Sequence, residues 1–220
     1  REQGFELPEF EEFVVAGEYK LPPKESRDHW LAEFRADPQK HPVSTPSGKL
    51  ELFSQRIADF RYADCPGHAT WLEPYEWLGG ETAQTYPLHL LSPQPSRRLH
   101  SQMDQSAYSQ AGKIAGKEVL TMHSRAAAER GIKEGDLVRV YNDRGACLAG
   151  VAIDPNMRPD VVSLPTGAWF QPEHPAKTKS TELNGNPNVL TRDKGTSRLA
   201  QGPSAHTCLV EVVLHKPVLR

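Results

Sequence analysis

The stretch DLVRVYNDRGACLAGVAID, residues 136–154, carries the strongest fold signal in the sequence. Two runs rich in β-forming residues flank the tetrapeptide NDRG at 142–145. Asn, Asp and Gly favour the backbone of a tight turn, so the pattern predicts an antiparallel β-hairpin.

Similar short runs lie on both sides of this hairpin. YPLHLLS (86–92) predicts a strand, DPNMRPDVVSLPTGAWF (154–170) predicts a turn followed by a strand, and SAHTCLVEVVLH (204–215) predicts a final strand. SRAAAERGI predicts a helix with Ser124 as N-cap and Gly131 at the C′ position. Many short strands with one or two helices indicate a β-barrel-like domain.

The first part of the chain has a different texture. SRDHWLAEFRADP predicts a short helix capped by Ser26 or Asp28 and ended by Pro38. Residues 50–60 predict a strand that passes into a short helix, and the Pro-, Gly- and Trp-rich residues that follow predict irregular packing. We therefore expect a boundary near residue 85. The expected parts are an irregular α/β segment, 1–84, and a mainly β domain, 85–220.

Composition limits the classes of function. A formal net charge of -2 and a pI of about 6.5 disfavour a general nucleic-acid surface, although a local basic patch stays open. The three cysteines are far apart, and no CxxC, CxxH or HExxH motif supports a disulfide framework or a zinc site. No apolar run approaches the roughly 20 residues of a membrane span, so we expect a soluble chain. Because the sequence starts at an arginine, we expect a piece of something longer, and cytoplasm and periplasm both stay open.

Three irregular segments are rich in hydrogen-bonding side chains: SPQPSRRLHSQMDQSAYSQ (92–110), PTGAWFQPEHP (165–175) and the segment 182–206. Long loops without secondary structure are usually functional or disordered. Val189-Leu190 and Leu199 look like apolar anchors, which disfavours disorder. The donors suit a ligand with many heteroatoms and some negative charge, because Arg pairs with phosphate and amides pair with heterocycle edges.

Each of these signals also has an ordinary structural explanation. The pair Arg97-Arg98 is more often solvated than a phosphate clamp, and His100 alone is more often a satisfied polar residue than a catalyst. Trp169 is most often a core residue. Buried, inert thiols are the default for Cys147 and Cys208. No GxSxG, P-loop or GxGxxG motif occurs, so no catalytic residue is assigned.

In combination, four segments resemble one family: YPLHLLSPQPSRRLHSQ, RGIKEGDLVRVYNDRGACLAGVAI, PTGAWF and GNPNVLTRDKGTSRLAQGPSAHTCLVEV. They are similar to the C-terminal part of dimethyl sulfoxide reductase-family molybdenum enzymes, closest to the biotin sulfoxide, dimethyl sulfoxide and trimethylamine N-oxide reductases. HPVSTPSGKLELFSQRIADF and CPGHATWLEPYEWLG resemble the segment before that domain. The resemblance covers nearly all of the chain from about residue 28.

The resemblance implies a six-stranded double-psi β-barrel with short helices that covers a bis(molybdopterin guanine dinucleotide) molybdenum cofactor. It also implies a set of cofactor contacts from the three segments: Ser92, Arg98, His100, Ser101, Gln102, Trp169, Asn186, Asn188, Gln201 and His206. Gln171 departs from the family pattern, in which we expect an acidic residue, so no role is assigned to it.

The resemblance further implies oxygen-atom transfer that reduces an S-oxide or an N-oxide while molybdenum cycles between Mo(IV) and Mo(VI). The protein ligand of the metal, a Ser in this group, belongs to earlier domains, so no metal ligand is expected here. The fragment would be inactive alone, and its partners would be the remaining domains and a small substrate, not nucleic acid or membrane. The alternative is a double-psi barrel that acts as an interaction module without cofactor. The cofactor hypothesis requires residues 92–102 and 184–201 to converge on one concave face.

Overall fold

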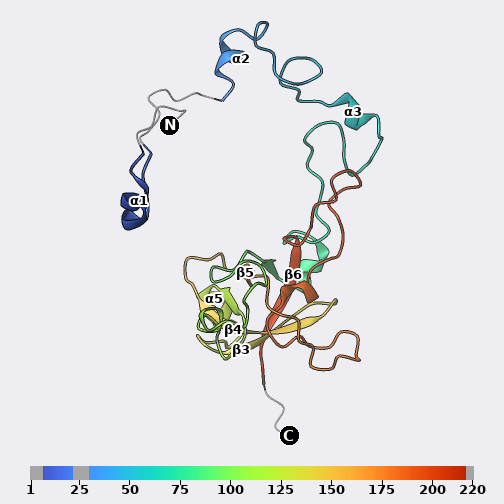
Figure 1. Ribbon diagram of the computed structural model, residues 1–220. Helices are drawn as coiled ribbons and strands as arrows, with labels where there is room; N and C mark the ends of the chain where they lie inside the picture. The colour runs from blue at the N-terminus through green and yellow to red at the C-terminus, as the bar shows by residue number, and fades with distance from the viewer. Residues whose placement is uncertain (1–6, 22–29, 217–220) are drawn as a thin grey trace. The chain divides into compact units, whose positions relative to one another are not determined.

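The computed structural model describes residues 7–21 and 30–216. The chain divides into two compact units, 1–54 and 55–220 (Figure 1).

In the described residues of the first unit, the secondary structure consists of two short helices, α1 (Phe10–Ala16) and α2 (Ala32–Ala36). Helix α2 ends just before Pro38, as predicted, whereas the predicted caps Ser26 and Asp28 lie outside the described residues. The strand expected over residues 50–53 is wrong, because the described structure has no strand there and Leu52 is 91% exposed. An apolar run stays a strand only where another strand accepts its hydrogen bonds.

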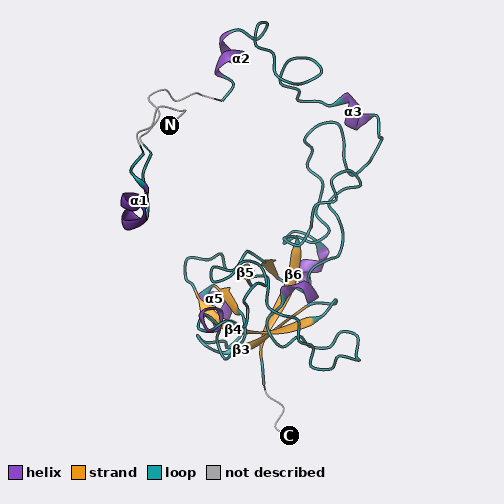
Figure 2. Cartoon of the chain, viewed as in Figure 1, coloured by secondary structure: helices purple, strands orange, loops and turns teal. Residues whose placement is uncertain are grey.

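The second unit is built around six strands that close into a barrel (Figures 1 and 2). The strands are β1 (Leu88–Leu91), β2 (Val119–Met122), β3 (Leu137–Tyr141), β4 (Ala146–Ile153), β5 (Val161–Ser163) and β6 (Cys208–Leu214). Their order around the barrel is β1-β5-β2-β4-β3-β6. The pairs β1–β5 and β2–β4 are parallel and the other four are antiparallel. The expectation of a mainly β fold with a six-stranded barrel is confirmed, and closure leaves no edge strand to cover.

Short helices precede the first strand or lie in the connections between strands. They are α3 (Gln55–Ala58), η1 (Glu81–Gln84), α4 (Ala107–Gln110), α5 (Ser124–Ala128) and η2 (Pro187–Val189). Helix α5 begins one residue earlier than predicted. Its N-cap is His123, whose Nδ1 accepts a hydrogen bond from the Arg125 N–H at 2.9 Å, so the assignment of Ser124 as the cap is wrong. Gly131 has the left-handed backbone expected at the helix end, with φ of 65°.

The predicted hairpin is present as β3 and β4. Their register runs from Leu137 opposite Gly150 to Tyr141 opposite Ala146, and the turn closes with a hydrogen bond from Asn142 N–H to the Gly145 carbonyl. Every residue of β4 from Ala146 to Val151 is buried. One face of β4 lines the barrel core and the other is covered by loops, which explains its nearly continuous apolar sequence.

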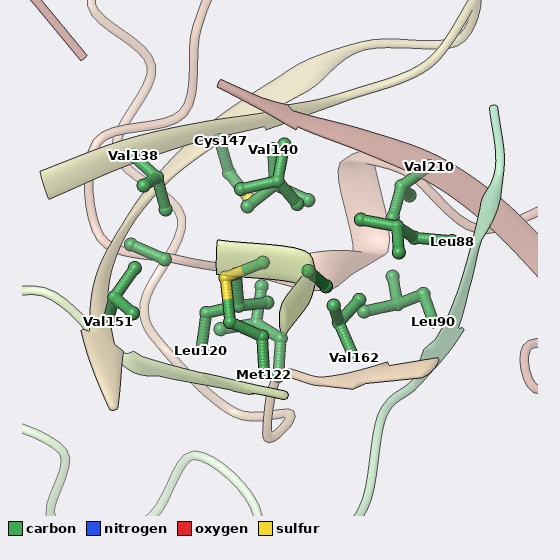
Figure 3. Packing of buried hydrophobic residues seen from close by; sticks show 14 of the residues in the cluster. Leu88, Leu90, Leu120, Met122, Val138, Val140, Cys147, Val151, Val162 and Val210 are labelled. Atoms are coloured by element: carbon green, nitrogen blue, oxygen red, sulfur yellow. The ribbon is translucent and has the colours of Figure 1, made fainter. Parts of the chain in front are cut away.

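The core consists of alternate residues from the strands, whose side chains point toward one another inside the barrel (Figure 3). Its fully buried members include Leu90, Leu120, Met122, Val138, Val140, Val151, Val162 and Val210. Leu190, directly after η2, is also fully buried, which confirms one anchor predicted for the last polar segment. Leu199 is 42% exposed and is not an anchor.

A buried ion pair joins residues 55–84 to the barrel. The Glu76 carboxylate accepts two hydrogen bonds from the Arg144 guanidinium in the β3–β4 turn and one from the Leu209 N–H of β6. The segment before residue 85 is therefore folded against the barrel from residue 55 on. In the described part of the chain, no helix is both long and apolar enough to cross a bilayer.

Candidate functional site

The first polar segment leaves β1 as an irregular loop with two residues in left-handed backbone conformation, His100 and Met103. Ser92 is buried at the end of the strand, whereas His100, Ser101 and Gln102 are exposed. The loop therefore presents an imidazole, a hydroxyl and an amide to its surroundings.

Beneath this loop lies a cluster of buried charges centred on Arg98, whose side chain is only 2% exposed. The Arg98 guanidinium lies 2.6 Å from Glu118 Oε2 and 3.4 Å from Asp104 Oδ1, and Asp104 Oδ1 lies 2.8 Å from Lys113 Nζ. Arg98 also donates to the carbonyls of His100 (3.1 Å) and Thr166 (2.9 Å). Its guanidinium is therefore engaged with protein groups, and the two cations of the cluster are matched by two carboxylates.

The second polar segment, PTGAWF, packs directly on the first. Gly167 has a φ of 92°, and a Cβ at this position would lie 2.0 Å from the His100 carbonyl oxygen, so only glycine fits. Trp169 is 52% exposed, its indole N–H donates to the Ser101 carbonyl at 2.9 Å, and its backbone N–H donates to Asp104 Oδ2 at 3.2 Å. Trp169 is thus a surface residue held in place at both its backbone and its ring.

The third polar segment is joined to the second through amide side chains. Asn184 donates from Nδ2 to the Trp169 carbonyl at 2.8 Å, and Asn186 donates from Nδ2 to the Ala168 carbonyl at 2.8 Å. Asn186 also caps η2, because its Oδ1 accepts from the Asn188 N–H at 3.0 Å. Asn186 is buried and Asn188 is exposed.

The first and third segments meet at Glu118. Its carboxylate binds Arg98, its N–H donates to the Asn184 carbonyl at 2.9 Å, and its Cβ lies 2.7 Å from where a Cβ on Gly185 would be. We call residues 98–104, 166–171 and 182–188 the loop junction. Its exposed members from the predicted set are His100, Ser101, Gln102, Trp169 and Asn188.

Two predicted contacts lie in other surroundings. Gln201 interacts within its own turn through Arg198, and the His206 carbonyl accepts from His89 Nε2 at 2.6 Å. The chain near them borders a cavity of about 600 Å³ lined by Thr196, Ser204, Thr207 and residues of the segment 63–75. Convergence with the first segment is thus seen for residues 184–188, while the contacts of residues 196–207 run toward residues 63–75.

The buried thiols of Cys147 and Cys208 have raised pKa values. Burial raises the pKa of Cys147 well above its usual range, and the nearby Glu182 carboxylate raises it further. Burial likewise raises the pKa of Cys208 to about 11, although Arg144 opposes it. Both thiols are buried, as expected, and their raised pKa values disfavour the thiolate, which is the nucleophilic form.

Three acidic residues that organise the loop junction were not indicated by the sequence: Asp104, Glu118 and Glu182. All three are buried, although acidic residues in polar loops are ordinarily solvated. A buried Arg98 would have required carboxylate partners. The sequence does not show that Arg98 is buried, because burial is set by tertiary packing.

Residues 88–209 match the family described as Molydopterin dinucleotide binding domain. The chain is 48% identical over 216 residues to a biotin sulfoxide reductase of Cereibacter sphaeroides, covering 98% of this chain and 28% of that protein. It is 41% identical over 210 residues to a trimethylamine-N-oxide reductase of Haemophilus influenzae, covering 94% and 25%. It is 40% identical over 210 residues to a dimethyl sulfoxide/trimethylamine N-oxide reductase of Rhodobacter capsulatus, covering 95% and 25%. The chain therefore spans about a quarter of the length of these relatives.

The fold is shared with a solved structure, the acetylene hydratase from Pelobacter acetylenicus. The TM-score is 0.64 at 21% identity, over 81% of this chain and 25% of that one. The match at 88–209 runs from the first residue of β1 into β6 and includes the whole loop junction. The chain belongs to the molydopterin dinucleotide binding domain family.

Proposed function

We propose that this chain is the portion of a molybdenum oxidoreductase that holds bis(molybdopterin guanine dinucleotide), and that the whole protein reduces an S-oxide or an N-oxide by oxygen-atom transfer. The observation that carries the proposal is the family match over the barrel, combined with the meeting of three polar segments at the loop junction. The printed names of the relatives, which are sulfoxide and N-oxide reductases, support the reaction class.

The residues at the loop junction fit such a cofactor by their chemistry. A pterin presents alternating donors and acceptors, which the exposed amides of Gln102 and Asn188 can match in either orientation. The hydroxyl of Ser101 and the imidazole of His100 can donate to anionic oxygens. Because Arg98 is paired with buried carboxylates, it is not available as a phosphate clamp, and the exposed donors of Ser101, Gln102 and Asn188 are hydroxyl and amide groups. This favours contact with a heterocycle edge over neutralisation of a phosphate charge.

The predicted set then separates by role. We propose that His100, Ser101, Gln102, Trp169 and Asn188 contact the cofactor directly. The buried members, Ser92, Arg98 and Asn186, would support the backbone that carries these contacts. Gln201 and His206 would contact a different part of the cofactor, from the end of the third segment.

When bound, the cofactor supplies the molybdenum redox chemistry, and the protein supplies binding and orientation. In this proposal the exposed Trp169 and Asn188 would help to hold and orient the bound heterocycle. We assign no catalytic residue and no metal ligand within this chain. The remaining domains of the whole protein would provide the ligand and the pocket for a small substrate, and the chain alone would be inactive. We also propose that the barrel domain proper begins near residue 85.

The test compares Asn188→Ala with Asn156→Ala in the full-length protein. Asn156 is an exposed asparagine in the β4–β5 turn, whose contacts go to Asp154. We expect Asn188→Ala to weaken cofactor retention about two- to tenfold, which corresponds to one hydrogen bond, and Asn156→Ala to leave it unchanged. The readouts are molybdenum by elemental analysis and guanine nucleotide released on acid hydrolysis. Equal molybdenum and guanine contents in the two variants would count against the assignment.

A further inference from the structure

Glu182 is fully buried, and its carboxylate is surrounded by backbone amides. Oε1 accepts hydrogen bonds from the N–H groups of Gln171 at 3.1 Å and Asn184 at 2.9 Å, and Oε2 accepts from the Asn186 N–H at 2.7 Å. In the described part of the chain, these hydrogen-bond partners are all backbone donors. The side chain thus spans the second and third polar segments at the point where they meet.

The backbone of Glu182 fixes this carboxylate relative to the barrel. The Glu182 N–H donates to the Ala146 carbonyl and its carbonyl accepts from the Leu148 N–H, both at 2.8 Å, so it lies against strand β4. Strand β4 is the longest of the six strands and pairs with β2 and β3. Glu182 therefore connects a rigid element to two irregular loops.

Burying a carboxylate is unfavourable unless strong hydrogen bonds compensate for the lost water. Bonds from N–H to an ionised oxygen are roughly twice as strong as bonds between neutral groups, and an ionised carboxylate offers acceptors only. Three convergent N–H donors match that inventory. A neutral amide of the same shape would turn an NH2 group toward at least one backbone N–H.

We propose that Glu182 is a positioning residue for the cofactor contacts Trp169 and Asn188. It orients the Asn186 N–H directly, and Asn186 in turn bonds the Ala168 carbonyl and the Asn188 N–H. It also fixes Gln171, two residues after Trp169. Because it is fully buried, Glu182 acts through these neighbours and not by touching the ligand. This role rests on the function proposed above.

The main variant is Glu182→Gln in the full-length protein, which keeps the shape and changes one oxygen to a donor. The matched control is Glu173→Gln, an exposed carboxylate in the same part of the chain. Two quantities are measured: hydrogen–deuterium exchange of peptides that cover 169–171 and 184–188 in cofactor-free protein, and molybdenum and guanine per folded protein.

For Glu182→Gln we expect exchange in these peptides to accelerate about tenfold or more, the loss expected for a hydrogen bond to a charged group. Peptides from β3 and β4 should keep their protection, which separates a local effect from general unfolding. Cofactor content should fall in Glu182→Gln and stay at the wild-type level in Glu173→Gln. Glu182→Asp keeps the charge on a shorter stem and should give a content between these two.

Unchanged exchange in Glu182→Gln would overturn the proposal, as would faster exchange with unchanged cofactor content. If Glu182→Gln does not yield folded protein, Glu182→Asp decides the matter, because wild-type exchange and content in that variant would also overturn it. A wild-type protein without molybdenum and guanine would overturn the proposed function itself, and that result is visible before any variant is compared.

Discussion

Replacement of Arg98 gives the sharpest test of the buried charge cluster. Arg98→Met keeps much of the apolar stem and removes the guanidinium, whereas Arg97→Met does the same at the neighbouring position. The Arg98 guanidinium bonds Glu118 and the carbonyls of His100 and Thr166. Arg97 is exposed and bonds only one carbonyl in the described structure, that of Tyr108, whose ring lies 4.9 Å away.

The expected costs differ because Glu118 is left behind in a buried position. Removing one partner of a buried ion pair costs about 3–5 kcal/mol, since the remaining charge is neither solvated nor paired. An exposed cation stacked on an aromatic ring contributes about 0.5–1 kcal/mol. With a urea slope of about 2 kcal/mol per M, the midpoint for Arg98→Met should fall by about 1.5–2.5 M, against about 0.5 M or less for Arg97→Met.

The assay is urea unfolding of the chain followed by circular dichroism. A double variant, Arg98→Met with Glu118→Gln, provides the further check, because it removes the unpaired charge and should recover part of the loss. Equal midpoints for the two arginine variants would refute the reasoning. So would a double variant that is less stable than the sum of the single changes.

Three further predictions address the fold. Gly167→Ala should destabilise the chain by about 2–4 kcal/mol, because it combines left-handed strain with a backbone oxygen 2.0 Å from the new Cβ. Gly131→Ala, with open space around it, should cost only about 1–2 kcal/mol. Thermal melts of the two variants measure both costs, and equal costs would contradict this account. Burial alone would raise the pKa of Glu76, but hydrogen bonds from Arg144 and a backbone N–H outweigh it and hold that pKa below its ordinary value of 4.5. The stability that ionised Glu76 contributes is therefore fully present above pH 4.5 and is lost as pH falls through the lower pKa of the folded state. When the free energy of unfolding is measured against pH, Glu76→Gln should reduce the loss of stability on the acid side. An unchanged loss on the acid side would contradict this role of Glu76. With iodoacetamide at pH 8, the partly exposed Cys65 should react in the native state, whereas Cys208, with a pKa of about 11, should react only after unfolding. Mass spectrometry follows the labelling, and modification of Cys208 in the native state would count against its burial.

Local pattern was sufficient for elements in which turn residues lie next to runs of β-forming residues. The β3–β4 hairpin was predictable because its turn residues and both strands are contiguous, and β1, β5 and β6 followed from short apolar runs next to turn signals. Strand β2 was missed, although β1 also has four residues that pair with strands distant in sequence, so pairing distance alone does not decide which strand can be recognised. The run at 50–53 had a similar local pattern and formed no strand in the described structure, so the pattern alone does not distinguish the two cases.

The sequence by itself determined the chemistry of the candidate site: three polar segments, rich in amides and hydroxyls, in a mainly β domain. Only the tertiary structure decided which of those groups face outward. Arg98 was a candidate surface clamp in the sequence, and it is buried because Glu118 and Thr166, 20 and 68 positions away, come within hydrogen-bonding distance. In the sequence, Glu182 is an acidic residue in a polar loop with nothing to distinguish it. In the structure, three backbone N–H groups donate hydrogen bonds to its carboxylate. A charge is stable in the interior only when its partners arrive there too, and barrel closure, not local propensity, brings these partners together.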